Sequence, residues 1–426
     1  MRISSKKADS LASIIDAGMY RFGVAAVSLI LGIIAAPEEF GLFASILIPV
    51  GLFQACFEGL VRGSSSRLFT NFFTRGTMNA ISSKGALVGI PAVLGFALFQ
   101  IWRLGLDLST LLLVLPLVFA PYLTTLSSMT QRLIQLQGDW VLLAKVRSLV
   151  TFVVLVPCLF ALFFTKSILV ASVFLPLTEV LILVLLNKHV HALSPDNLVH
   201  TELIGLRREV GDFIPFQVRF WLLTQSDRLV VSLIAPAQIV GIYLISVALS
   251  RLPFEVSSSS LNAVLRNKLS ADQGDSLKSK LSNQTNLNLQ IFNILSFIVV
   301  GFFVFQLLPS LNPELSDVPY LVMVLMSSVF MKSASSVVWT RSIFEHGTFG
   351  KSSTQGLAIL GAAAAGLLAT QDLFLGCLAI AIREILTSGW ILWKWKNYSS
   401  LLISSVAVAL TLLAVFWSVT AYIFAN

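Results

Sequence analysis

Charged residues are scarce in this sequence. They make up 12% of its 426 residues, whereas a soluble globular domain carries roughly 25%. Hydrophobic residues make up 56%, and long apolar stretches recur from one end of the chain to the other. A surface of this kind requires lipid as its solvent. The composition therefore predicts an integral membrane protein without a soluble catalytic domain and without a nucleic-acid partner.

Cysteine and histidine are also few, and no enzyme motif is present. The three cysteines lie within apolar stretches, where we expect them to be packing residues: Cys56, Cys158 and Cys377. The pair of histidines at His189 and His191 lies in a polar stretch and is a weak metal signal. HExxH, Walker and GxSxG motifs do not occur. The sequence thus predicts no enzyme, no metal and no cofactor, with transport driven by a gradient or the membrane potential.

The apolar stretches predict an all-α polytopic fold with about thirteen transmembrane helices. A helix needs about 20 apolar residues to cross the hydrocarbon core. The predicted spans are residues 11–36, 41–62, 83–103, 109–133, 140–165, 167–187, 211–235, 238–262, 286–308, 317–340, 352–370, 373–395 and 400–424. The longest polar stretches between spans, Arg62–Lys84, Lys188–Asp212 and Leu265–Asn286, are expected to be loops.

Lysine and arginine are distributed unequally between the two sides of the predicted spans. One set of loops and adjoining span ends carries most of the cations and accounts for the net charge of +8. The alternate set has only Arg103 and Lys166 as cations, beside acidic residues such as Glu38 and Asp317. Cytoplasmic loops are the ones enriched in cations. The N-terminus is therefore predicted to be cytoplasmic, and thirteen spans place the C-terminus outside.

Three ordered matches indicate an internal repeat. Residues 33–43 read IIAAPEEFGLF and residues 233–243 read LIAPAQIVGIY. Residues 95–101 (GFALFQI) match residues 301–307 (GFFVFQL), and Glu179 and Glu384 each follow a threonine by 14 residues. The repeat predicts two six-helix bundles related by a parallel axis. The expected lobes are residues 1–187 and 211–395, joined by a cytoplasmic linker at 188–210, with residues 396–426 as an extra helix.

Charged residues inside the predicted spans are the candidate functional residues, because charge is costly in the hydrocarbon core. They are Asp16, Arg21, Glu58, Glu179, Arg219, Asp227, Arg228, Arg251, Glu255, Lys332, Arg383 and Glu384. Arg251 and Glu255 are four residues apart on one helix face, so they could neutralise each other. Glu179 and Glu384 hold repeat-equivalent positions, which suits either pairing or ion coupling. The charges on spans 1 and 7 would line the central cleft of a two-lobed transporter.

Two segments match a known pattern: the hairpin Pro37–Phe43 reads PEEFGLF, and residues 227–230 (DRLV) are followed by 241–243 (GIY). They resemble the first hairpin and the start of the second half of the polysaccharide-biosynthesis flippases, which are the O-antigen and exopolysaccharide exporters. These proteins belong to the multidrug/oligosaccharidyl-lipid/polysaccharide exporter superfamily. The thirteenth helix departs from the usual twelve.

The resemblance implies two six-helix bundles around a V-shaped cleft in the inner membrane of a bacterium. It also implies transport of an undecaprenyl-pyrophosphate-linked oligosaccharide to the outer leaflet, for lipopolysaccharide or another surface polysaccharide, with a polymerase as a possible partner. Because arginine binds phosphate through two parallel hydrogen bonds, the candidate substrate-binding residues are Arg21, Arg219 and Arg251. Candidates for coupling to a proton or sodium ion, or for balancing charge, are Asp16, Asp227, Arg228, Glu255, Glu179 and Glu384.

Two other functions are compatible with the composition. A cation-coupled multidrug antiporter of the same superfamily would favour an acidic and aromatic cleft, whereas arginine is prominent here. A membrane polysaccharide polymerase or glycosyltransferase would need a large external loop, or an interfacial loop with acidic or metal-binding residues. The predicted external loops are short, so the flippase is the preferred hypothesis.

Overall fold

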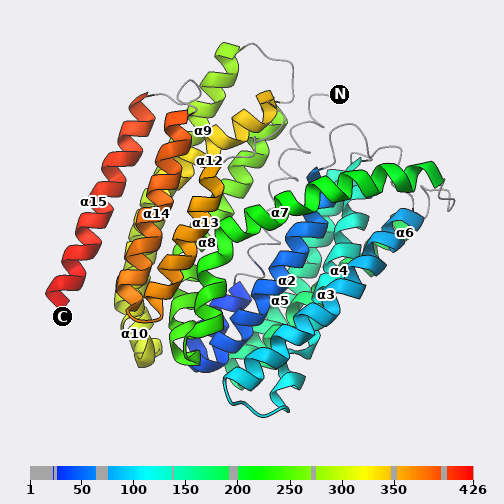
Figure 1. Cartoon of the computed structure of the whole chain (residues 1–426), viewed down its shortest axis with the longest axis horizontal. Coiled ribbons are helices and arrows are strands. Elements are labelled where there is room, and N and C mark those ends of the chain that lie inside the picture. The colour runs from blue at the N-terminus through cyan, green and yellow to red at the C-terminus, as the bar shows by residue number, and fades with distance from the viewer. Residues whose placement is uncertain are drawn as a thin grey trace. The chain divides into compact units, whose positions relative to one another are not determined.

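The computed structural model describes residue 23 and residues 26–63, 75–136, 139–190, 200–269, 275–346, 353–394 and 401–425. Every regular element among these residues is a helix (Figure 1). Ten of the described helices or helix pairs are long and apolar enough to cross a membrane. The predicted all-α membrane fold is therefore confirmed, while the count of thirteen spans stays a prediction.

The helices follow the predicted spans closely from residue 37 onward. They are α2 (Pro37–Gly63), α3 (Arg75–Arg103), α4 (Thr110–Leu136), α5 (Trp140–Thr165), α6 (Ile168–Val190), α7 (His200–Ile234), α8 (Ala237–Leu269), α9 (Asp275–Phe302), α10 (Leu308–Leu311), α11 (Val318–Ser327), α12 (Val329–His346), α13 (Ser353–Ala369), α14 (Leu373–Lys394) and α15 (Leu401–Ala425). A π-helical segment, Phe303–Leu307, joins α9 to α10. Most of the predicted span 11–36 lies outside the described residues.

Three of the polar stretches expected to be loops are partly helical, which corrects the sequence-based boundaries. Helix α3 begins at Arg75, α7 at His200 and α9 at Asp275. The hydropathy rule marks where a helix enters the hydrocarbon core, but a helix can continue beyond it because its backbone hydrogen bonds are internal. The predicted linker 188–210 therefore contains the first turns of α7.

The contacts divide the chain into two compact units, and the division falls within α7. The first unit comprises described residues up to Leu31 and Glu38–Gln225; the second comprises Gly32–Pro37 and the described residues from Ser226. In the first unit, α4 packs against α3 and α6, and α5 packs against α6. These units are defined by contacts and not by the internal repeat, so the boundaries of the two predicted lobes stay a prediction.

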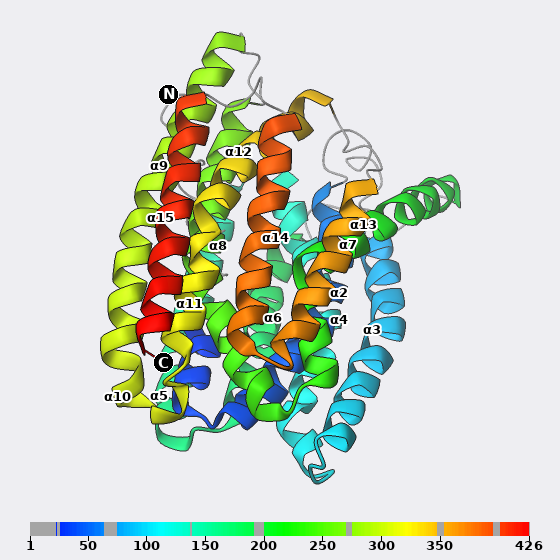
Figure 2. The same ribbon diagram turned by 60° about the vertical axis from the view of Figure 1, so that its left-hand side comes forward.

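In the second unit, α11 and α12 form the central span. They contact α8, α9, α14 and α15 (Figure 2). Within the span Val318–Val338, 89% of the most apolar 18-residue stretch is buried inside the protein. The corresponding share for the span Ser404–Ile423 in α15 is 22%. The central span carries the buried cluster of Met331, Ala334 and Val338, which packs against Leu392 and Ala407.

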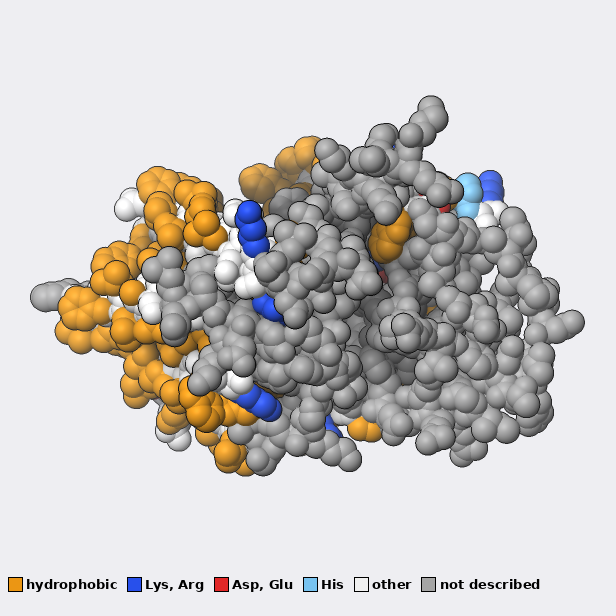
Figure 3. Space-filling model, turned by 90° about the horizontal axis from the view of Figure 1, so that it is seen from above, with side chains coloured by type: hydrophobic (Ala, Val, Ile, Leu, Met, Phe, Trp, Pro, Cys, Tyr) orange, Lys and Arg blue, Asp and Glu red, His pale blue; other side chains and the backbone are white. Residues whose placement is uncertain are grey.

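Helix α15 is a packed part of the second unit. Trp417 makes edge-to-face ring contacts with Phe297 and Phe305, at centroid distances of 6.2 and 6.0 Å. Farther along the helix, Tyr422 stacks on Phe374 at 3.6 Å. The other side of α15 exposes large apolar residues, among them Leu413 and Phe416, and hydrophobic side chains gather at the left of the view in Figure 3. Such a face suits lipid contact.

The central span is broken between α11 and α12, at a pair of serines. The Ser327 hydroxyl donates to the Val324 carbonyl at 2.6 Å, and the Ser328 hydroxyl lies 2.9 Å from the Leu325 carbonyl. A serine that donates to a carbonyl of the preceding turn, as Ser327 does, often bends its helix. The residues that follow the break, from Ser328 to Lys332, present two polar side chains to α14.

Candidate functional site: a buried charge network

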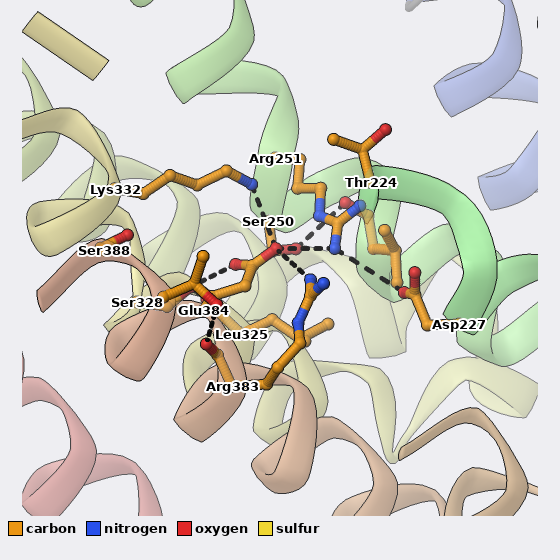
Figure 4. A network of polar contacts seen from close by, with 12 residues as sticks. Thr224, Asp227, Ser250, Arg251, Leu325, Ser328, Lys332, Arg383, Glu384 and Ser388 are labelled. Atoms are coloured by element: carbon orange, nitrogen blue, oxygen red, sulfur yellow. Dashed lines mark hydrogen bonds and ion pairs between the residues drawn. The ribbon is translucent and has the colours of Figure 1, made fainter. Parts of the chain in front are cut away.

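Three charged side chains from three helices meet inside the second unit. Arg251 of α8 places Nη2 2.8 Å from Oε1 of Glu384 on α14, and 3.7 Å from Oδ2 of Asp227 on α7. The Tyr243 hydroxyl donates to the same Asp227 oxygen at 2.6 Å. Figure 4 shows the Arg251 guanidinium between the two carboxylates. One arginine thus ties α8 to both α7 and α14.

Glu384 is the centre of this network. Its Oε1 also lies 3.1 Å from Nζ of Lys332 and 3.5 Å from Nη2 of Arg383 (Figure 4). Its Oε2 accepts a hydrogen bond of 2.7 Å from the Ser328 hydroxyl. A single carboxylate therefore meets three cations, all within the 4 Å of an ion pair. The described network, counting Asp227 and Glu384 against these three cations, is more positive than negative.

The centre of the network lies at the middle of a spanning helix. Glu384 is near the midpoint of α14 (Leu373–Lys394), which places it about 15 Å from either end at about 1.5 Å per residue. Charges at this depth cost at least about 3 kcal/mol each when unpaired. Pairing across the helices offsets that cost.

Close packing shields the acidic end of the network. Asp227 is fully buried, and its Oδ1 has no hydrogen-bond partner in the described part of the chain. A Cβ added at Gly366 of α13 would lie 2.8 Å from the Asp227 carbonyl oxygen. Glycine is therefore needed at position 366 because the backbones of α7 and α13 approach closely.

The structure brings together three of the predicted site residues, namely Asp227, Arg251 and Glu384. Arg228 is partly buried, and Arg251, Asp227 and Glu255 act on its charge. Glu255 itself is exposed on α8. Arg251 is directed to other helices, although it is also within electrostatic range of Glu255.

The remaining predicted residues are elsewhere. Arg219 is exposed on the part of α7 that belongs to the first unit. Glu179 is buried in α6 of the same unit. Asp16 and Arg21 lie outside the described residues. Substrate binding by Arg21 and Arg219, and ion coupling or charge balance by Asp16 and Glu179, stay predictions.

The sequence predicts Lys332 and Arg383 only as charged candidates without a specific role, and it does not single out Ser328 or Tyr243 as site residues. Lys332 and Arg383 were visible as charges inside apolar spans, which is a usable signal. Ser328 and Tyr243 were not visible, because isolated hydroxyl residues are common in transmembrane helices. The described residues contain no group of three or more His, Cys, Asp and Glu side chains that could hold a metal.

Comparison with known proteins places the fold among transporters. No family model matches the sequence, and no curated protein matches it. The structure is similar to lipid II flippase MurJ in an inward closed conformation, with a TM-score of 0.67, 12% identity, and coverage of 97% of this chain and 98% of that one.

Multidrug transporters are also similar. The eukaryotic MATE transporter AtDTX14 gives a TM-score of 0.61 at 15% identity, covering 97% of this chain and 99% of that one. An inward-facing MATE family transporter of the MOP superfamily gives 0.60 at 10% identity, covering 89% and 95%. The chain therefore has the two-bundle fold that MurJ and the MATE transporters share.

Proposed function

We propose that this chain is a flippase that moves an undecaprenyl-pyrophosphate-linked oligosaccharide across the bacterial inner membrane by alternating access. The observation that carries the proposal is the charge network at mid-membrane depth, in which three cations surround Glu384. A pyrophosphate headgroup is anionic and would be favoured there, while hydrocarbon excludes it. The similarity in fold to a lipid II flippase supports the same class of substrate.

In this proposal Arg21 and Arg219 contact the headgroup, and Arg251 holds the carboxylates of Asp227 and Glu384 in place. The exposure of Arg219 leaves its guanidinium accessible to a ligand. Arginine holds phosphate with a planar pair of donors that lysine lacks. The surface polysaccharide for which the oligosaccharide is made, O-antigen or another, belongs to the same proposal, as does a polymerase that would take up the product.

The direct test is flipping of a fluorescent lipid-linked oligosaccharide in proteoliposomes. The intact protein should move the lipid between leaflets, and a deletion strain should accumulate it on the cytoplasmic face. Arg219→Ala should abolish flipping while the protein still inserts, and Arg219→Lys should restore it partly. Exposed Lys145 on α5 offers a matched control, because Lys145→Ala also removes one cation. Normal flipping by Arg219→Ala would remove this residue from the proposed site.

The topology is part of the proposal. Positively charged loops support a cytoplasmic N-terminus, and thirteen spans would place the C-terminus outside. Reporter fusions at Lys280 and Asn426 should then report opposite sides of the membrane. The same side for both fusions would contradict the count of thirteen.

A second candidate is a cation-coupled multidrug antiporter. It is favoured by buried Asp227, whose Oδ1 lacks a hydrogen-bond partner in the described structure, and by the similarity to MATE transporters. A proton or sodium ion at this carboxylate would be the coupling ion. Efflux of a cationic dye that depends on Asp227, without movement of lipid-linked oligosaccharide, would favour the antiporter over the flippase.

A further inference from the structure

We propose that Lys332 is the cation that passes from Glu384 to the phosphate of the substrate, with Glu384 acting as an internal counter-ion. This inference rests on the proposed function, because it takes the substrate to carry phosphate. In the structure the Lys332 ammonium is held by Glu384 at 3.1 Å. When the substrate binds, its phosphate replaces the carboxylate as the partner of Lys332.

The first argument is that Glu384 can release one cation and remain neutralised. Its Oε1 meets Arg251 at 2.8 Å and Arg383 at 3.5 Å in addition to Lys332. Its Oε2 holds the Ser328 hydroxyl at 2.7 Å. If Lys332 leaves, a close arginine and a hydroxyl still satisfy the carboxylate. The exchange therefore leaves no unpaired acid inside the bilayer.

The second argument is that Lys332 is the cation best placed to leave. Its side chain is 26% exposed, against 7% for Arg251 and 12% for Arg383. Arg251 is also fixed by Asp227, whereas the ion pair of Lys332 is with Glu384 alone among the described contacts. The lysine stem has four flexible carbons, so its ammonium can move without backbone change.

The surroundings of Lys332 suit an ammonium that moves between two partners. The Phe254 ring lies 5.3 Å from Nζ, which favours a cation over its face. Figure 4 shows Lys332 reaching Glu384 from the side opposite Asp227. An anion that arrives at the exposed edge of the network would therefore meet Lys332 before the two arginines.

The exchange also explains how the site can favour anions without an unpaired charge in the empty state. A lone lysine at this depth would be costly, and Glu384 removes that cost. A cationic ligand would meet an ammonium of the same sign and be rejected. A phosphate group would instead gain an ion pair whose lysine is already desolvated and positioned, so less free energy is lost on binding.

The test is binding of farnesyl pyrophosphate, a short polyprenyl pyrophosphate, to the full-length protein in phosphatidylcholine nanodiscs. Farnesol serves as the probe without phosphate. Lys332→Gln should weaken pyrophosphate binding by about tenfold or more, which is the effect of losing one charged hydrogen bond. Lys332→Arg should retain most of the affinity. Lys145→Gln on α5 is the matched control and should change binding less than about twofold, since exposed sites contribute little.

Glu384→Gln distinguishes exchange from a structural role. Removing the competing carboxylate should tighten pyrophosphate binding several-fold, because Lys332 no longer has to leave a partner, and Asp227 still pairs with Arg251. A structural role for the pair predicts weaker binding instead. Thermal melting of each variant shows whether it is folded. If Glu384→Gln does not fold, the Lys332→Gln and Lys332→Arg results decide the question.

The outcomes separate this inference from the proposed function. If the unaltered protein binds farnesyl pyrophosphate no better than farnesol, the proposed phosphate-bearing substrate is wrong and the inference is lost with it. If the unaltered protein binds pyrophosphate but folded Lys332→Gln binds equally well, only the exchange is wrong. Weakened binding by folded Glu384→Gln would overturn the counter-ion role in the same way.

Discussion

The central span of the second unit buries polar groups in two different ways on two faces of α12. Toward α14, Lys332 meets Glu384 and the Ser335 hydroxyl lies 3.2 Å from that of Ser388. Toward α9, the contacts are neutral: Gln290 Nε2 donates to the Phe330 carbonyl at 3.0 Å, and Asn293 Nδ2 donates to the Ser333 hydroxyl at 2.6 Å. One helix therefore carries a charged face and an amide face.

The difference between these faces separates contacts that only join helices from contacts that could also respond to a ligand. A neutral amide pair across two membrane helices contributes on average about 0.6 kcal/mol, because the separated helices find other partners. A charged group has no such substitute in lipid, so its loss leaves a partner exposed to the full cost of desolvation. The amide face can join helices without controlling function, whereas the charged face couples stability to any ligand that changes its charge.

The largest expected loss of stability is at the charged face. Arg251→Ala removes a side chain that bridges Glu384 and Asp227. Breaking a buried ion pair from one side typically costs about 3–5 kcal/mol. Unfolding in detergent or bicelles should show this loss, while Lys145→Ala at an exposed position should stay within about 0.5 kcal/mol. Equal stability of the two variants would show that Arg251 is not needed to hold the three helices.

An intermediate loss is expected where two backbones meet without any polar side chain. A Cβ at Gly241 in the first turns of α8 would overlap the carbonyl oxygen of Pro37, so Gly241→Ala should cost about 1–3 kcal/mol through overpacking. Gly95 on α3 is the matched control, since nothing lies within 4 Å of its added Cβ. Gly95→Ala should stabilise the helix by about 0.5–1 kcal/mol. Opposite signs of the two effects, measured by thermal melting, would confirm the close approach.

Much of the charged face could be predicted from the sequence, because intramembrane charge is a strong signal. Asp227, Arg251 and Glu384 were selected on that ground and meet in the structure. The partner of Arg251 was not predictable from spacing. Glu255 lies four residues away on the same helix, but the arginine reaches across to other helices, and spacing along one helix carries no information on its neighbours.

Other features needed three-dimensional information. Lys332 turns toward Glu384 after the break at Ser327 and Ser328. Two serines in an apolar span do not by themselves predict a helix break. The boundaries of α5 coincide with the prediction at 140–165 because Asp139 caps its start and Lys166 ends it in a left-handed conformation. Helix α9 has no such limit near residue 286, and it begins earlier, at Asp275.

The amide face also escaped prediction, although its residues are polar. Asn286, Gln290 and Asn293 lie three or four residues apart, which places them on one side of α9. That pattern resembles the polar end of a loop as much as a buried stripe. All three are buried in the structure, and Gln290 Nε2 also lies 3.3 Å from the Asn286 Oδ1 atom.

The smallest expected loss of stability is therefore at the amide face, and it tests whether the charged and amide faces of α12 differ in function. Gln290→Leu keeps a similar volume and removes the hydrogen bond to the Phe330 carbonyl, which should cost about 0.6 kcal/mol. The loss is reduced further because Gln290 Oε1 has no hydrogen-bond partner in the described structure, so leucine also removes a buried acceptor. The Phe330 carbonyl remains within a helical turn of α12.

Flipping and pyrophosphate binding by Gln290→Leu should be unchanged, because this face carries no charge. A loss of stability as large as that of Arg251→Ala, or a loss of transport in a folded Gln290→Leu protein, would show that the amide face takes part in function and that the two faces of α12 do not divide the work.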